Sequence, residues 1–132
     1  MRTPSRRIAR LLTGATYALL GLDALRSPGG RVDTAGPLLD TLRGVVPLPE
    51  DDELLVRANG GVQAAAGAAL ALGVLPRPAA LALVGSMIPT TLAGHAFWAV
   101  EDPAARRMQQ VQFLKNLAMI GGLIQVALDR GD

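Results

Sequence analysis

The sequence predicts an all-α membrane protein in which four transmembrane helices pack as an antiparallel bundle. The chain has 132 residues, room for one domain, of which 50% are hydrophobic and only 18% are charged. A soluble domain typically carries about 25% charged residues. The sequence also contains four apolar stretches of about twenty residues, and a helix of that length, about 30 Å, matches the hydrocarbon core of a bilayer.

The first predicted span covers residues 8–25 and follows Arg2, Arg6 and Arg7. No clean small-residue cleavage site follows it, so it is predicted to be a retained helix and not a signal peptide. Residues 27–53 are rich in Gly and Pro and are predicted to form an outer loop. Within this loop, the amphipathic piece from Pro37 to Val46 is expected to lie on the membrane surface or to cap the bundle.

The other three spans are predicted at residues 54–75, 79–100 and 108–128. Acidic residues 50–53 precede the second span and favour a helix start, because they complement the positive end of the helix dipole. A turn of two prolines separates the second span from the third. Pro89 is expected to kink the third span, because it lacks the N–H that an interior helical residue donates.

A soluble, Ala-rich four-helix bundle is the competing fold. Such helices would carry a charged outer face, whereas residues 64–75 and 79–88 are apolar all round, which favours the membrane fold. The arginines before the first span predict that both termini lie in the cytoplasm, and residues 27–53 then face outward.

Each predicted span carries polar side chains, and antiparallel packing would bring them to the same end of the bundle. The deepest of them is Lys115, about 12 Å from the segment end at ~1.5 Å per residue. An ionisable group inside a bilayer costs a few kcal/mol, so Lys115 is expected to face the bundle interior and to have a function. The candidate ligand-binding or network residues are Asp23, Asn59, Gln63, Thr91, His95, Trp98, Gln112, Lys115 and Asn116.

Structural roles compete with binding for these residues. The amide side chains are equally consistent with interhelical hydrogen bonds, and Trp98 with an anchor at the membrane interface. His95 would then be a structural donor. Lys115 is expected to join a network with His95, Asn116 and an acid, Asp23 or Glu101, or simply to form an ion pair with that acid.

Small residues at Gly60, Ala64, Gly67 and Ala68 predict a surface for close helix packing and for self-association into a homo-oligomer. The chain has no Cys and one His, which excludes disulfides and iron–sulfur chemistry and argues against a metal site. Nucleic acid is not a predicted partner, because the arginines are spread out and few aromatic residues accompany them. The predicted surroundings are a lipid bilayer.

Several elements in order along the chain resemble the DoxX family of small four-helix bacterial membrane proteins. They are IPTTLAGHAFW, DPAARRMQQVQFLKN, a Gly-Gly-Leu and the late Asp129. The resemblance covers residues 54–129 well and the first span more loosely. It implies a bundle in the bacterial plasma (inner) membrane that is associated with redox systems, including thiosulfate:quinone oxidoreduction, and that has redox-protein partners. No catalytic residue set is carried over.

The first hypothesis is therefore an auxiliary subunit of a membrane redox or oxidative-stress complex, not an enzyme alone, that binds a quinone or another lipid-soluble ligand. In this hypothesis His95, Lys115 and Asn116 donate hydrogen bonds to the ligand in an apolar slot. No other cofactor is predicted. The second hypothesis is a structural assembly protein without a ligand. A small-molecule transporter is disfavoured, because four short helices enclose little volume.

Overall fold

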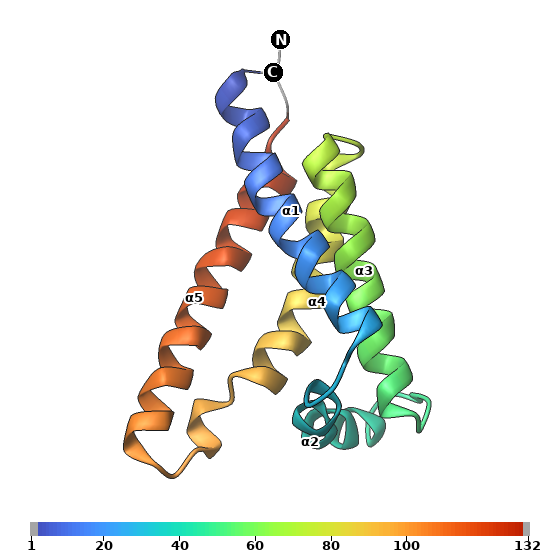
Figure 1. The fold of residues 1–132 in the computed structure, drawn as a ribbon, viewed down its shortest axis with the longest axis vertical. Helices are drawn as coiled ribbons and strands as arrows, with labels where there is room; N and C mark the ends of the chain where they lie inside the picture. The colour runs from blue at the N-terminus through green and yellow to red at the C-terminus, as the bar shows by residue number, and fades with distance from the viewer. Residues whose placement is uncertain (1–2, 131–132) are drawn as a thin grey trace.

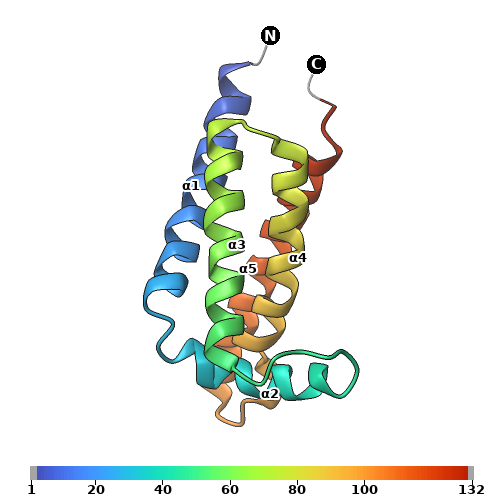
Figure 2. The ribbon, with the colours of Figure 1, turned by 90° about the vertical axis from the view of Figure 1, so that its right-hand side faces the viewer.

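Residues 3–130 are described in a computed structural model and form five α-helices, one 3-10 turn and no strand. The prediction of an all-α chain is confirmed over these residues. The long helices run in alternating directions, and α2 lies across one end of them (Figures 1 and 2). The elements are α1 (Pro4–Arg26), α2 (Arg31–Arg43), α3 (Asp52–Leu72), α4 (Pro76–Gly94), η1 (Phe97–Ala99) and α5 (Pro103–Leu128).

Aspartate caps and prolines set the starts of the long helices. The Asp51 carboxylate accepts a hydrogen bond from the Leu54 N–H (3.1 Å), and the Asp102 carboxylate accepts one from the Ala105 N–H (2.9 Å). These bonds satisfy backbone donors that have no partner within the helix. Helix α3 ends at Gly73, whose φ of 72° lies in the left-handed region that favours glycine.

Helices α1 and α3 are in backbone contact at four glycines. A Cβ atom on Gly60 would lie 2.8 Å from the Gly21 carbonyl oxygen, and one on Gly67 would lie 2.7 Å from the Gly14 carbonyl oxygen. Gly14 and Gly21 are seven residues apart on α1, and Gly60 and Gly67 are seven residues apart on α3. The two pairs meet in antiparallel order. The predicted self-association surface on residues 60–68 therefore packs, through both of its glycines, against α1 of the same chain.

The apolar core lies where α1, α3, α4 and α5 approach one another. Its largest fully buried side chains are Tyr17, Leu70, Leu83 and Leu123, one from each of these helices. Toward the α2 end, α5 diverges from α1 (Figure 1), and α5 packs mainly on α4. The four long helices therefore share their apolar core at the end away from α2.

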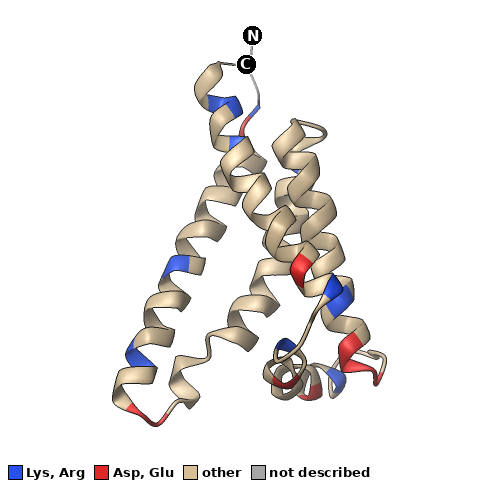
Figure 3. Ribbon diagram, in the orientation of Figure 1, with Lys and Arg blue, Asp and Glu red and all other residues tan. Residues whose placement is uncertain are grey.

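Three of the described helical segments are long and apolar enough to cross a membrane: Pro4–Arg26, Pro76–Ala99 and Pro103–Leu128. Helix α3 has the length but carries Arg57, Asn59 and Gln63, which lower its hydropathy. In Figure 3 most charged positions lie near the ends of the helices and on α2. Four spans were predicted, and the structure shows an all-helical chain with three candidate spans.

The helices start and end a few residues from several of the predicted boundaries, and two of the differences bear on the site. The amphipathic helix in the outer segment begins at Arg31 and contains Pro37 in its interior, whereas the sequence suggested a start at Pro37. The third predicted span, residues 79–100, contains a helix that ends at Gly94, followed by the short turn η1. The helix ends there because Gly94 is a weak helix former and the backbone of His95, which follows it, is not helical.

Candidate functional site

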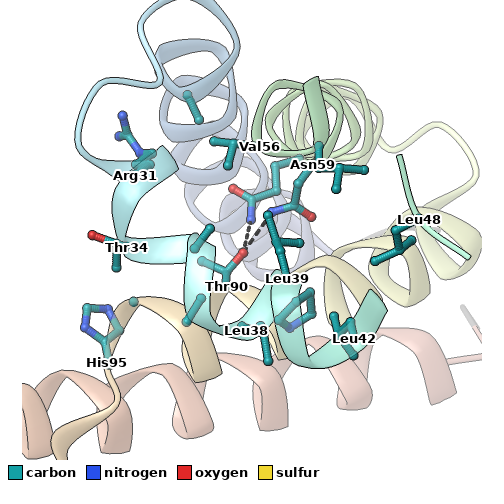
Figure 4. A pocket seen from close by; sticks show the side chains of 17 residues that line it. Arg31, Thr34, Leu38, Leu39, Leu42, Leu48, Val56, Asn59, Thr90 and His95 are labelled. Atoms are coloured by element: carbon teal, nitrogen blue, oxygen red, sulfur yellow. Dashed lines mark hydrogen bonds between the residues drawn. The ribbon is translucent and has the colours of Figure 1, made fainter. Parts of the chain in front are cut away.

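A pocket of about 550 Å³ lies beneath α2, between that helix and the facing parts of α3 and α4. Leu38, Leu39 and Leu42 of α2 and Leu48 of the following loop form much of its apolar lining. Figure 4 shows these leucines beside the Asn59 and Thr90 side chains. We call this space the α2 pocket. Its combination of an apolar wall with a few polar groups is typical of small-molecule sites.

The polar floor of the α2 pocket is a hydrogen-bonded network between α3 and α4. The Asn59 amide N–H donates to the Thr90 hydroxyl oxygen (2.9 Å), and the Gln63 amide N–H donates to the same oxygen (3.3 Å). The Ser86 hydroxyl donates to the Asn59 carbonyl oxygen (2.6 Å). Ser86 and Gln63 are buried, so these bonds are made away from solvent and stabilise the helix pair.

His95 lies at the edge of the α2 pocket, in the residue that follows α4. Its Nδ1 atom lies 2.8 Å from Oε1 of Gln109 on α5. A side-chain oxygen of glutamine only accepts, so His95 Nδ1 is the donor and the imidazole is oriented by α5. His95 thus belongs to the pocket and also ties α4 to α5.

Arg43 fastens α2 to the start of α3. Its guanidinium donates to the Pro49 carbonyl oxygen (2.8 and 3.0 Å) and to the carboxylates of Asp40 (3.1 Å) and Asp52. The hydrogen bond to Asp52 is the main cause that raises the pKa of Arg43 above its ordinary value. These contacts hold the wall of the α2 pocket in place at its C-terminal end.

The structure brings three of the predicted site residues, Asn59, Gln63 and His95, to the α2 pocket. Two others meet elsewhere: the Asn116 amide of α5 donates to the hydroxyl of Thr91 on α4 (3.1 Å). Because Thr91 is buried, this bond ties α4 to α5 inside the bundle.

The remaining predicted residues lie apart from the α2 pocket. Asp23 forms an exposed ion pair with Arg31 (2.8 Å), so the expected Asp23–Lys115 contact is not made. Gln112 and Lys115 are exposed on α5, and within residues 3–130 the Lys115 side chain has no hydrogen bond or ion pair. Trp98 is 52% exposed and packs edge-on against Phe97 and Phe113.

Sequence reasoning missed Thr90, which lines the pocket, and Ser86, which supports the lining by donating to Asn59. Their signal was present, since Ser86 and Thr90 are one helical turn apart and lie on the same face. It also missed Gly14 and Gly21, whose spacing of seven matches that of Gly60 and Gly67. The described residues contain no group of three or more His, Cys, Asp or Glu side chains placed to hold a metal ion.

A second pocket, of about 610 Å³, lies between α1 and α5 near the end where α1 begins and α5 ends. Tyr17 lines it, and the Tyr17 hydroxyl is buried without a hydrogen-bond partner among the described residues. The ion pair between Arg6 and Asp129 (3.4 Å) joins the two helices at that end. Its polar lining comprises Thr13, Thr16, Tyr17, Gln125 and Asp129, and the Thr16 hydroxyl donates to the Leu12 carbonyl (2.8 Å).

Comparison with known proteins identifies the family. No curated protein and no solved structure matches the chain. A sequence model of the DoxX family matches residues 6–96, which is well over half of the chain. The match contains α1 to α4 and His95, and it ends before the aromatic, Asp-Pro and Gly-Gly-Leu elements noted in the sequence. The chain therefore belongs to the DoxX family of membrane proteins, as its sequence predicted.

Proposed function

We propose that this protein is an auxiliary subunit of a bacterial membrane redox or oxidative-stress complex and that it binds a lipid-soluble ligand, such as a quinone, in the α2 pocket. The observation that carries the proposal is the pocket itself, a space of about 550 Å³ with leucines on one side and amide, hydroxyl and imidazole groups on the other. A ring with polar substituents and an apolar tail matches that division.

The test is a binding titration on the full chain in mild detergent, with decylubiquinone and its reduced form as probes. Ala93 lines the pocket and Ala82 is exposed on the same helix, so Ala93→Phe and Ala82→Phe form a matched pair. We expect Ala93→Phe to lose binding and Ala82→Phe to retain it. If neither form of the probe binds the wild-type protein, the ligand-binding function is wrong.

A structural assembly role is the second candidate. The hydrogen bonds among Asn59, Ser86 and Thr90 favour it, because they join α3 to α4 without a ligand. Lipid extraction followed by mass spectrometry separates the two functions, since an assembly protein would retain no stoichiometric small molecule.

The exposed face of α5 is the proposed contact for a partner protein of the complex. Lys115 lies midway along α5 and is exposed, and an ionisable group facing lipid would be costly. A partner that offers a carboxylate or carbonyl groups would remove that cost. Lys115→Met should abolish copurification of the partner while ligand binding in the α2 pocket persists; full retention of partner and redox function would overturn this assignment.

The proposed topology has four spans, α1, α3, α4 and α5, with both termini in the cytoplasm of the bacterium and α2 outside. In support, α1 begins and α5 ends at one end of the bundle, opposite α2 (Figure 2). The chain has no Cys, so a Ser27→Cys variant gives an unambiguous label. We expect labelling of intact cells at Ser27→Cys and protection of Ser5→Cys; the reverse pattern would invert the topology.

A further inference from the structure

We propose that the α2 pocket selects ligands that donate a hydrogen bond, namely lipid-soluble phenols and hydroquinones, over ligands of the same shape that only accept one. The inference rests on the proposed function, because it concerns the ligand of the same pocket. It follows from which donors and acceptors on the floor of the pocket already form hydrogen bonds within the protein.

The Thr90 hydroxyl fixes the orientation of the floor. Its one O–H donates to the carbonyl oxygen of Ser86 (2.9 Å), which leaves only lone pairs on the Thr90 oxygen. Asn59 and Gln63 both approach that oxygen, so each must present its N–H₂ group to it. The two amides therefore cannot be turned over without losing a hydrogen bond.

This orientation leaves an acceptor free on Gln63. The Gln63 N–H₂ group is used by Thr90 and by the sulfur of Met87 (4.0 Å), and its carbonyl oxygen accepts no hydrogen bond in the part of the chain that the structure describes. The Asn59 carbonyl, by contrast, already accepts from Ser86. Gln63 lines the α2 pocket, so a ligand there meets an unpaired carbonyl oxygen.

His95 adds a second acceptor at the pocket edge. Because its Nδ1–H donates to Gln109, the neutral imidazole has a lone pair on Nε2. No hydrogen bond to Nε2 is present within residues 3–130. Gln63 and His95 thus each offer an acceptor to an O–H or N–H of the ligand.

At the exposed edge of the pocket, Arg31 uses two of its N–H groups for Asp23 and the Ser27 carbonyl and keeps the others, and the Thr34 hydroxyl donates to the Gly30 carbonyl. On the floor, the amide donors of Gln63 are used by Thr90 and Met87, and one N–H of Asn59 remains. A phenolic O–H can donate to an acceptor and accept from that N–H, whereas an ether or ketone oxygen would leave the Gln63 oxygen unpaired. An acceptor that a bound ligand shields from water without pairing it lowers the affinity, by roughly tenfold or more.

The experiment measures binding of para-nonylphenol and para-nonylanisole to the full chain in detergent by calorimetry. These probes have similar shape, but only the phenol donates. We expect the phenol to bind roughly tenfold more tightly or better, and decylubiquinol to bind more tightly than decylubiquinone. Equal affinities, or a preference for the anisole or the quinone, overturn the selectivity and leave the ligand-binding function standing. Failure of all four probes to bind overturns both.

Two variants locate the selectivity. Gln63→Met keeps the length and apolar stem but removes the acceptor, so it should bring the ratio of phenol affinity to anisole affinity close to one. A purely structural role would lower both affinities together and would contradict the proposal. If Gln63→Met does not fold, His95→Phe serves instead, with a loss of phenol preference as the expected result and an unchanged preference as the contradicting one.

Discussion

The α1–α3 and α4–α5 helix pairs are both antiparallel, but different kinds of contact hold them together. Between α1 and α3 the glycines at 14, 21, 60 and 67 bring the two backbones into direct contact. Between α4 and α5 the contacts combine apolar packing with side-chain hydrogen bonds, from Asn116 to Thr91 (3.1 Å), between His95 and Gln109 (2.8 Å), and from Arg77 to the Ala127 carbonyl (2.8 Å). A side chain added between α1 and α3 should therefore prevent their packing. Each substitution between α4 and α5 should lower the stability by a small amount that is independent of the others.

The largest expected effect is from Gly67→Leu. A side chain at this position would meet the backbone of Gly14, Tyr17 and Ala18, and backbone atoms cannot move aside as a flexible side chain can. Overpacking in cores costs about 1–3 kcal/mol and more where nothing yields, so we expect the variant to fail to accumulate as folded protein. Expression and thermal unfolding in detergent measure this.

Gly85→Leu is the matched control, because nothing lies within 4 Å of a Cβ at Gly85. It should fold as well as wild type or better, since glycine inside a helix costs about 0.5–1 kcal/mol relative to alanine. Equal tolerance at positions 67 and 85 would show that α1 and α3 are not in backbone contact.

A medium effect is expected from Asn116→Leu, which removes the α5 donor to Thr91. Interhelical hydrogen bonds in membrane proteins contribute about 0.6–2 kcal/mol, so the loss of unfolding free energy should fall in that range. A double-mutant cycle with Thr91→Val isolates the pair. A coupling energy of zero would mean that apolar packing alone holds α4 to α5.

A local effect is expected from Arg43→Ala. The variant loses the hydrogen bonds to Pro49 and Asp52, so α2 should detach from the start of α3 and the segment that follows α2 should be cleaved faster in limited proteolysis. Arg26→Ala is the control, because Arg26 is exposed. The overall unfolding temperature should change little in both variants, and equal cleavage rates would contradict the role of Arg43.

The smallest effect is expected from Tyr17→Phe. The Tyr17 hydroxyl is fully buried without a partner among the described residues, and such a group costs about 1–3 kcal/mol to bury. Its removal should leave stability unchanged or raise it by up to about 1 kcal/mol. A clear loss of stability would reveal a hydrogen bond, for example to a bound molecule in the α1–α5 pocket.

The sequence predicted the helical fold from composition and segment length, and it placed Asn59, Gln63 and His95 at one end because depth along a helix follows from residue number. Depth does not determine the face. Asn116 and Lys115 are adjacent in sequence and so point about 100° apart on a helix with ~3.6 residues per turn. One reaches Thr91 and the other is exposed. The position of α2 over the pocket could not be predicted, because it depends on the course of the loops on either side of α2, and no periodicity in the sequence describes that course.

The closeness of α1 and α3 also bears on how the chain enters a membrane. Helix α3 is not one of the three segments that are apolar enough by composition to cross a bilayer. Its backbone nevertheless packs directly against that of α1, which is one of them. Packing through glycines relies on dispersion and Cα–H···O contacts, which need no expulsion of water and operate within lipid. We therefore expect α1 to act as an insertion partner, so that a chain lacking residues 4–26 would leave α3 at the membrane surface.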